Sequence, residues 1–306
     1  MARTGQLVAG HSLQVVVSSD ALTETWRAMH LQQGTLRGVR ILRPEAAVHA
    51  DAWRTLVERQ QKLIHPCRLQ VFAVADVDGL PAAVVEWVNG PSLLTWSRVR
   101  PRPINELIHV FAEVADGVSM AHDAGVLHGA IDPRRIWMKP QGGTFTPKVD
   151  LAVEALGTSL RLCPVRAPEQ ISNQPIDERT DLYLLGATLY EIVARNPPFD
   201  AGSTRPPSLS HVRPDAPPGL VQLVSALLEP DPGHRPESLE EVREILMAVV
   251  RGEPLPALSH GIAAEKTAVP VPSPPPRGSL SGWIAMAAGA AAVGSLATAV
   301  WLAYLA

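Results

Sequence analysis

Histidine and cysteine are the side chains here that could hold a metal or act as nucleophiles, and their spacing argues against both uses. Of ten histidines, His122 and His128 are the one close pair, without a carboxylate or cysteine at metal-ligand spacing. The two cysteines, Cys67 and Cys163, lack the spacing of a zinc site or a disulfide framework. A Gly-x-Ser-x-Gly elbow and a Walker A loop are also absent from the sequence. Zinc, hydrolase and P-loop chemistry therefore find no support.

The charge balance limits the possible partners. Lys and Arg number 27 against 30 Asp and Glu, which gives a formal net charge of -3. A strongly basic surface of the kind that binds phosphate backbones is therefore not expected, and nucleic acid is excluded as a partner. The 306 residues are 46% hydrophobic, which is ample for a core. Few cysteines and an N-terminus without an uninterrupted apolar run predict a domain in the reducing cytosol.

Ordered sequence motifs carry a family resemblance. They are 166–170 (Arg-Ala-Pro-Glu-Gln), 177–186 (Asp-Glu-Arg-Thr-Asp-Leu-Tyr-Leu-Leu-Gly), 196–199 (Asn-Pro-Pro-Phe) and 228–236 (Leu-Glu-Pro-Asp-Pro-Gly-His-Arg-Pro). In this order they resemble the helical lobe of bacterial receptor-type Ser/Thr protein kinases. Earlier in the chain, 38–42 resembles the strand that bears the phosphate-contacting lysine, and 86–90 resembles the hinge between the two lobes. The resemblance covers roughly residues 7 to 250.

Hydrophobic periodicity agrees with this resemblance. Short β-branched stretches predict strands at 15–17, 38–42, 71–74 and 82–88, with one helix at 53–64. Later segments have helical periodicity, at 104–122, 181–194, 220–228 and 239–250. We therefore predict an α+β, bilobal protein kinase-like fold at residues 1–251. Its small β-rich N-lobe covers about 7–88, and its larger α-helical C-lobe covers about 91–251.

Three charged residues receive structural roles from the resemblance. In the family, Glu169 pairs with Arg235 and fixes the activation segment on the helical lobe. A buried bidentate pair of this kind is costly to break from either side. Asp181 resembles the aspartate that accepts hydrogen bonds from the backbone of the catalytic loop. The supports of the C-lobe are thus retained.

The positions that the resemblance places around ATP are altered. They are Ser18, Asp20, Thr23, Arg40, Glu86 and Val88. The first three stand where the family has glycines that let the backbone approach the phosphates, and Asp20 adds a negative charge. Arg40 replaces the lysine, and Leu56 takes the place of the lysine's glutamate partner. Glu86 and Val88 belong to the hinge that would face an adenine. The predicted cofactor is none, with ATP binding doubtful and magnesium disfavoured.

The catalytic loop differs most from the family. Residues 128–135 read His-Gly-Ala-Ile-Asp-Pro-Arg-Arg, where the family has His-Arg-Asp-Leu-Lys-Pro-x-Asn. Ala130 replaces the proton acceptor, and Asp132 replaces a lysine that steadies the γ-phosphate. Arg135 replaces the asparagine that holds a second magnesium, and a guanidinium cannot ligate a cation. Without a gap, the family's metal-binding aspartate falls on Leu151; one gap places Asp150 there instead, and both alignments stay open.

The C-terminal tail predicts membrane attachment. Residues 252–281 are rich in proline and read as a juxtamembrane linker. Residues 282–306 contain no charge and are long enough to cross the roughly 30 Å of a bilayer core as one transmembrane helix. Lys266 and Arg277 precede this span, which predicts a cytoplasmic N-terminal domain and a C-terminus at the far side of the cell membrane. Its small residues favour a dimer of such helices.

These substitutions lead to a functional hypothesis. Residues that catalyse as a unit lose most of their effect when one is removed, so we predict that no catalytic residue is intact. The chain is then an inactive family member, a membrane-anchored pseudokinase that scaffolds other proteins, such as an active kinase or its substrate. Two alternatives stay open. One is a residually active Ser/Thr protein kinase that uses Arg40, Arg134, Arg135 and Asp150; the other is an ATP-binding sensor.

Overall fold

The computed structural model describes residues 2–150, 164–199 and 206–256. The chain divides into two units, Met1–Ile262 and Ala263–Ala306, and the described residues all lie in the first. The predicted transmembrane helix at 282–306, and the linker from residue 257 onward, lie outside the described residues. Within the part that is described, no helix is long and apolar enough to cross a membrane.

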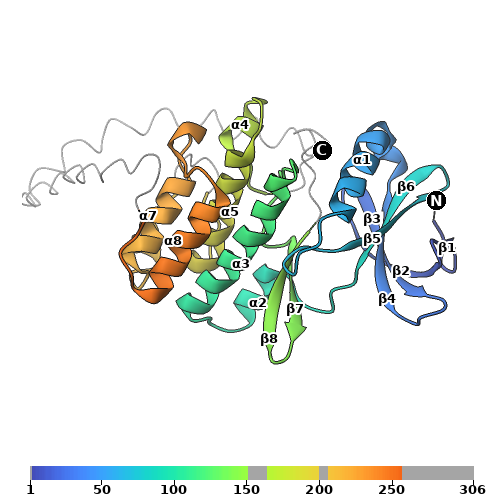
Figure 1. The fold of residues 1–306 in the computed structure, drawn as a ribbon, viewed down its shortest axis with the longest axis horizontal. Coiled ribbons are helices and arrows are strands. Elements are labelled where there is room, and N and C mark those ends of the chain that lie inside the picture. Colours follow the sequence, from blue (N-terminus) through green and yellow to red (C-terminus); the bar gives the residue numbers. More distant parts are fainter. Residues whose placement is uncertain (1, 151–163, 200–205, 257–306) are drawn as a thin grey trace, which may run out of the picture. The chain divides into compact units, whose positions relative to one another are not determined.

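An antiparallel sheet of six strands forms the N-lobe (Figure 1). The strands are β1 (Leu7–Val8), β2 (His11–Ser19), β3 (Thr23–His30), β4 (Leu36–Leu42), β5 (Val71–Val77) and β6 (Leu80–Glu86). Their order in the sheet is β1-β2-β3-β4-β6-β5. The sequence did not predict β3, whose side chains are mostly polar. Pairing with β2 on one side and β4 on the other places it in the sheet despite that composition.

One long helix packs on this sheet. A 3-10 turn, η1 (Pro44–His49), leads into α1 (Ala50–Gln61). The helix buries Trp53, Leu56, Val57 and Gln60, which recur at the spacing of one helical face. We expected this helix at 53–64, so it begins and ends three residues earlier than predicted. Pro66 follows its end and disfavours helical backbone in the residue before it.

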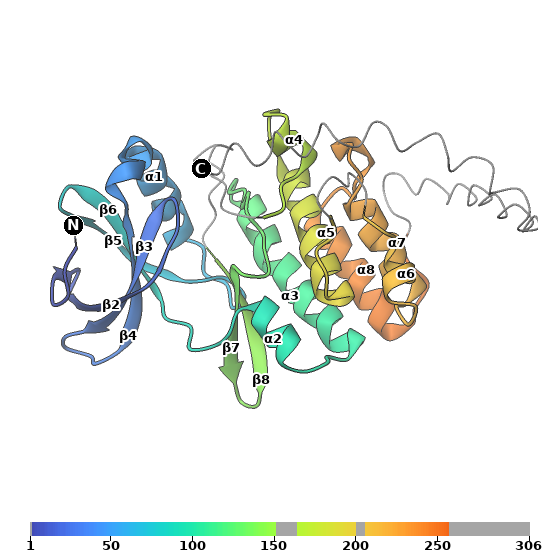
Figure 2. The same cartoon turned by 180° about the vertical axis from the view of Figure 1, so that it is seen from behind.

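The C-lobe is built from helices and one hairpin (Figure 2). Its elements are α2 (Leu93–Val99), α3 (Ile104–Asp123), β7 (Ile136–Gln141), β8 (Thr144–Val149), α4 (Pro168–Ile171), α5 (Glu178–Ala194), α6 (Leu209–Val212), α7 (Pro218–Leu227), η3 (Pro232–His234) and α8 (Leu239–Arg251). Helix α5 is buried along its whole length from Thr180 to Ala194. A helix that is covered on every side forms the centre of its domain. Helices α3, α6 and α7 pack against α5, and α8 packs against α3 and α7.

The connection between the lobes lies close to the β7–β8 hairpin. Strand β6 ends at Glu86, and the chain reaches α2 through residues 87–92. A side chain added at Gly90 would come within 1.9 Å of the Met138 carbonyl oxygen. Only glycine permits this approach, so the hinge and the hairpin are held together by backbone contact.

A buried ion pair holds α4, which the resemblance makes the end of an activation segment, on the helical lobe. Arg235, fully buried, donates to Glu169 from two nitrogens, at 2.7 and 2.9 Å. The Thr180 hydroxyl donates to the same carboxylate at 2.8 Å. The guanidinium also donates to the backbone oxygens of Arg179, Glu229 and Pro230. Glu169 and Arg235 therefore lie together as the resemblance implies.

We predict that Glu169→Ala will destabilise the domain by about 3–5 kcal/mol, because it leaves the charge of Arg235 buried without its partner. Urea unfolding monitored by circular dichroism would measure the change. Glu253→Ala is the matched control, since Glu253 and its partner Arg251 are half exposed and such pairs contribute about 0–1 kcal/mol. Equal effects of the two substitutions would contradict the role given to Glu169.

Candidate functional site

A cavity of about 280 Å³ lies between the hinge and the N-lobe sheet. Residues 85–90 form its hinge side, Ser18 and Thr25 lie on β2 and β3, and Arg40 lies on β4. Its volume is close to the lower end of the range of about 300–1,000 Å³ found for small-molecule sites. The cavity therefore brings together four residues that the sequence assigned to the nucleotide cleft: Ser18, Arg40, Glu86 and Val88.

Glu86 is held in place by two lysines of the β7–β8 hairpin. Lys139 approaches one carboxylate oxygen at 2.7 Å, and Lys148 approaches the other at 2.9 Å. Burial acts to raise the pKa of Glu86, but hydrogen bonds from Lys139 and Lys148 outweigh it and the pKa is lowered. The Glu86 side chain thus stays charged and anchors the hinge to the C-lobe. Val88 lies beyond the end of β6, so its backbone is outside the sheet ladder.

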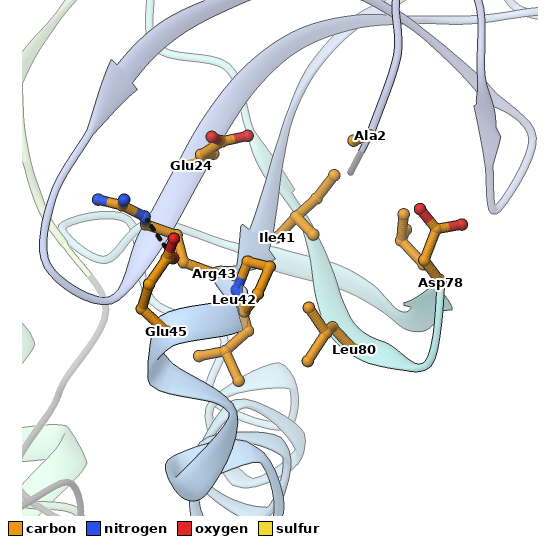
Figure 3. A pocket seen from close by; sticks show the side chains of 10 residues that line it. Ala2, Glu24, Ile41, Leu42, Arg43, Glu45, Asp78 and Leu80 are labelled. Atoms are coloured by element: carbon orange, nitrogen blue, oxygen red, sulfur yellow. Dashed lines mark ion pairs between the residues drawn. The ribbon is translucent and has the colours of Figure 1, made fainter.

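A second cavity on the N-lobe is much smaller. Figure 3 shows it beside the end of β4, with Ile41 and Leu80 around it and Arg43 paired with Glu45. Its volume is about 60 Å³, which is far below that of a nucleotide site. Of these two cavities, only the one at the hinge approaches the volume of a small-molecule site.

Next to Arg40, which lines the hinge cavity, a buried carboxylate lies between two arginines. Arg40 contacts one oxygen of Asp150 at 2.6 Å, and Arg135 contacts the other at 3.3 Å. Asp150 is 6% exposed, so this contact across the lobes is shielded from water. Arg40 Nε is buried and has no hydrogen-bond partner within the described residues. Of the two candidates for the metal-binding position, Asp150 is thus beside Arg40, whereas Leu151 lies outside the described residues.

Leu56 is part of an apolar cluster and does not face a charge. It is 2% exposed and belongs to a cluster with Leu63, Ala121 and Val126. The glutamate of the family's regulatory helix therefore has no counterpart at this position. Asp150 supplies the negative charge beside Arg40 instead.

The turn between β2 and β3 is closed by its own side chain. The Asp20 carboxylate accepts from the backbone N–H groups of Leu22, at 2.8 Å, and Thr23, at 2.7 Å. The same side chain faces Arg135 at 3.8 Å. An isolated carboxylate would repel a phosphate, but here its charge is directed to these donors and to Arg135.

Asp181 fixes the catalytic loop. This buried carboxylate on α5 accepts from the backbone N–H of His128, at 2.7 Å, and of Gly129, at 2.8 Å. His122 Nε2 contacts it at 2.8 Å. Burial acts to raise the pKa of Asp181, but hydrogen bonds with His122 and with the backbone of His128 lower it, so the carboxylate stays charged. Gly129 has a φ of 72°, a conformation in which glycine costs least, which explains why glycine fits there.

Two residues that replace catalytic groups of the family, Ala130 and Asp132, lie in different surroundings. Ala130 is 3% exposed and belongs to the apolar cluster that includes Leu22 and Trp53. Asp132 is also buried and accepts from the backbone and the guanidinium of Arg134. Arg134 in turn makes two hydrogen bonds to Glu191 of α5. Ala130 therefore supplies no proton acceptor, and Asp132 is engaged with Arg134.

Sequence reasoning missed one contact of the activation segment. Gln170 donates from Nε2 to the Gly129 carbonyl oxygen at 2.9 Å and accepts from the Ala167 N–H at 3.0 Å. It therefore joins the end of the activation segment to the catalytic loop without a charged group. Its place directly after Glu169 was a signal that could have found it.

The residues present fit a magnesium ion that arrives with a nucleotide. Within the described residues, no group of three or more His, Cys, Asp or Glu side chains comes together as a metal site. Magnesium in nucleotide sites commonly takes one or two carboxylates, with phosphate oxygens and water as its other ligands. Asp150 can be such a carboxylate, whereas Arg135 has no lone pair to offer a cation.

Comparisons with known proteins agree with this geometry. No family model matches the chain. It is 29% identical over 268 residues to the Ser/Thr protein kinase PkaA of Streptomyces coelicolor, which covers 80% of this chain and 49% of PkaA. It is 24% identical over 290 residues to the Ser/Thr protein kinase PknB of Mycobacterium tuberculosis, which covers 85% of this chain and 46% of PknB. The chain thus spans less than half the length of these relatives.

Solved structures decide the fold. The PknI kinase domain of M. tuberculosis superposes with a TM-score of 0.69 at 24% identity, over 82% of this chain and 100% of that domain. This chain has the protein kinase fold. Rad53 residues 1–466, in complex with AMP-PNP, share this fold with a TM-score of 0.65 and 18% identity, over 75% of this chain and 63% of that fragment. The β-rich N-lobe and helical C-lobe are the two lobes of that fold.

These relatives correct three of our predictions. The chain was expected to be a non-enzymatic scaffold, a catalytically inactive family member and a protein without a cofactor. Its relatives PkaA and PknB are Ser/Thr protein kinases, and a protein of the same fold is in complex with AMP-PNP. The comparisons therefore favour the alternative, a residually active Ser/Thr protein kinase that takes ATP. The retained supports and the charged pair around Asp150 are compatible with this correction.

We predict that the stability of the kinase fold falls between pH 7 and pH 5 because of His128. Burial lowers the pKa of this imidazole from 6.5 to about 4. As the pH falls, the unfolded chain takes up a proton that the folded chain does not, so stability present above pH 6.5 is lost towards pH 4. The loss from this group is about 2 kcal/mol by pH 5.

Urea unfolding at several pH values would measure it. In His128→Asn, an uncharged side chain that can still hydrogen-bond, this part of the pH dependence should disappear. An equal dependence in both proteins would contradict the assignment to His128.

Proposed function

We propose that this chain is a Ser/Thr protein kinase domain that binds ATP with magnesium and transfers the terminal phosphate to protein at a reduced rate. The observation that carries the proposal is the contact of 2.6 Å between Asp150 and Arg40, a residue that lines the hinge cavity. A basic side chain for the phosphates and a carboxylate for the metal are two of the charged groups that protein kinases place beside the nucleotide. The family of the curated relatives supports the same reaction.

The adenine would bind at the hinge and the phosphates would extend towards Arg40. The backbone of residues 87 and 88 lies outside the sheet at the cavity wall, where an adenine can exchange hydrogen bonds with it. Arg40 Nε is a buried donor without a partner in the described part of the chain, and a phosphate oxygen would satisfy it. Arginine also suits phosphate because its donors form a planar fork.

In the transfer step, a Ser or Thr hydroxyl oxygen bonds to the γ-phosphorus, the bond to the β–γ bridging oxygen breaks, and ADP leaves. Magnesium bound with the nucleotide would neutralise charge that develops on these oxygens. Ala130 offers no base, so the hydroxyl proton passes to a phosphate oxygen. A positioned base contributes about 10²–10⁴ in rate, and we expect transfer to be slower by about that factor than in a kinase that keeps the aspartate.

Binding and transfer should both depend on the charged pair. We expect AMP-PNP with magnesium to raise the thermal midpoint of the domain, because a ligand of the folded state stabilises it. Arg40→Ala should weaken this binding about tenfold to a hundredfold, the effect of losing a charge-assisted hydrogen bond to a phosphate. Asp150→Asn should abolish transfer of labelled phosphate from ATP to a protein substrate.

The matched control is Asp116→Asn, which removes a half-exposed carboxylate on α3 and should change neither measurement. Absence of any midpoint shift with AMP-PNP would contradict the nucleotide site. A shift without transfer would contradict the kinase activity and would indicate a domain that binds ATP without transferring phosphate.

We also propose that residues 282–306 anchor the domain in the cell membrane with its kinase fold on the cytoplasmic side. The support is the sequence, in which a span without charge follows Lys266 and Arg277. Anchoring would concentrate the domain near protein substrates in the same bilayer.

After carbonate extraction of bacterial membranes, we expect the full chain in the pellet and a chain ending at residue 281 in the supernatant. Ala292→Arg in the full chain should weaken retention, since a charge at the centre of a span opposes insertion. Recovery of the unaltered full chain in the supernatant would contradict the anchor.

A further inference from the structure

Arg135 occupies the part of the site next to Asp150 that a second metal ion would need. Its position is fixed through the backbone, because its N–H donates to the Asp132 carbonyl at 2.9 Å and its carbonyl accepts from the Asp150 N–H at 3.1 Å. Residues 135 and 150 are thus neighbours by hydrogen bonding as well as by charge. The two-metal arrangement of protein kinases uses an asparagine at the loop position where this chain has Arg135.

The guanidinium of Arg135 faces carboxylates from two directions. It contacts Asp150 Oδ2 at 3.3 Å and lies 3.8 Å from Asp20 Oδ2. Its side chain is only 14% exposed, so the charge has little solvent to move into. A guanidinium is always charged and has five donors but no acceptor. It therefore repels a cation and attracts a phosphate at the same place.

Arg40 differs from Arg135 in where it is attached. It lies on β4 of the N-lobe and contacts the other oxygen, Asp150 Oδ1. Asp150 can exchange its contact with Arg40 for one metal ion while Arg40 moves to a phosphate. A second ion on Asp150 would also have to displace Arg135, whose backbone is tied to residues 132 and 150.

We infer that the nucleotide site takes a single divalent cation, and that the Arg135 guanidinium contacts the phosphates in place of a second one. This inference rests on the proposed nucleotide binding. Asp150 holds the one cation, and Arg135 provides a fixed positive charge that needs no metal in solution. The site is therefore specific for a nucleotide carrying one ion.

The test counts Mn²⁺ ions bound to the full-length protein by equilibrium dialysis at saturating AMP-PNP, as the excess of total Mn²⁺ on the protein side over the side that holds nucleotide alone. Nucleotide binding is measured separately by thermal shift. We expect one ion per chain in the unaltered protein, one in Arg135→Lys and two in Arg135→Asn. Arg251→Asn, which removes an exposed arginine at the end of α8, is the control and should bind one ion per chain.

Two ions in the unaltered protein, or none while AMP-PNP is bound, would overturn the inference. One ion in Arg135→Asn with nucleotide bound would overturn the role of Arg135. Absence of the thermal shift in the unaltered protein would instead overturn the proposed function, and this inference with it. The ion count of the unaltered protein decides the matter even where a variant does not fold.

Discussion

The carboxylate of Asp181 is the interaction on which the site depends. It is fully buried, and it accepts from two consecutive N–H groups of the catalytic loop and contacts His122. A buried charge is tolerated only where hydrogen bonds replace its water, and here those bonds come from the loop itself. The loop is thereby fixed to α5, the central helix of the C-lobe. Arg135 and the backbone next to Asp150 are positioned as a consequence.

The residues beside the hinge cavity keep basic and acidic side chains in contact but arrange them differently from the family that the motifs resemble. An arginine on β4 pairs with a carboxylate after β8, where the family's lysine pairs with a glutamate of the regulatory helix. Leu56 therefore links α1 to the C-lobe by apolar packing with Ala121 and Val126. The position of α1 depends on burial and not on a charge. Among the carboxylates that the sequence analysis names, Asp150 is the one that pairs with Arg40 in the described residues.

Much of the fold could be predicted from the sequence, because motifs and helical periodicity mark the C-lobe. The central helix and Glu169, Asp181 and Arg235 are examples, since their roles depend on residue type at fixed spacing. Strand β3 was missed because its pairing, and not its side chains, determines it. Gln170 was missed because an uncharged side chain in a motif does not indicate its partner, which here is the carbonyl oxygen of Gly129.

The function was harder to predict than the fold. A family resemblance assigns a role to each position separately, and sequence spacing does not show which of the remaining charges meet in space. The choice between Asp150 and Leu151 is an example, since spacing alone cannot place a gap. The structure brings Asp150 to Arg40 and Arg135, and the relatives are kinases. The replacement of the family's catalytic aspartate by Ala130 was therefore not sufficient evidence for an inactive protein.

The turn closed by Asp20 has a consequence for the kinetics of nucleotide exchange. A glycine-rich turn can fold over the phosphates and open again without moving the rest of the lobe. Here the Asp20 side chain accepts hydrogen bonds from the N–H groups of Leu22 and Thr23, and Arg43 donates to the Asp20 carbonyl oxygen. These hydrogen bonds hold the turn in one conformation. A nucleotide would enter and leave by separation of the lobes, which also breaks the contact between Arg40 and Asp150. Its residence time would then be set by that slower, collective motion rather than by a local flap.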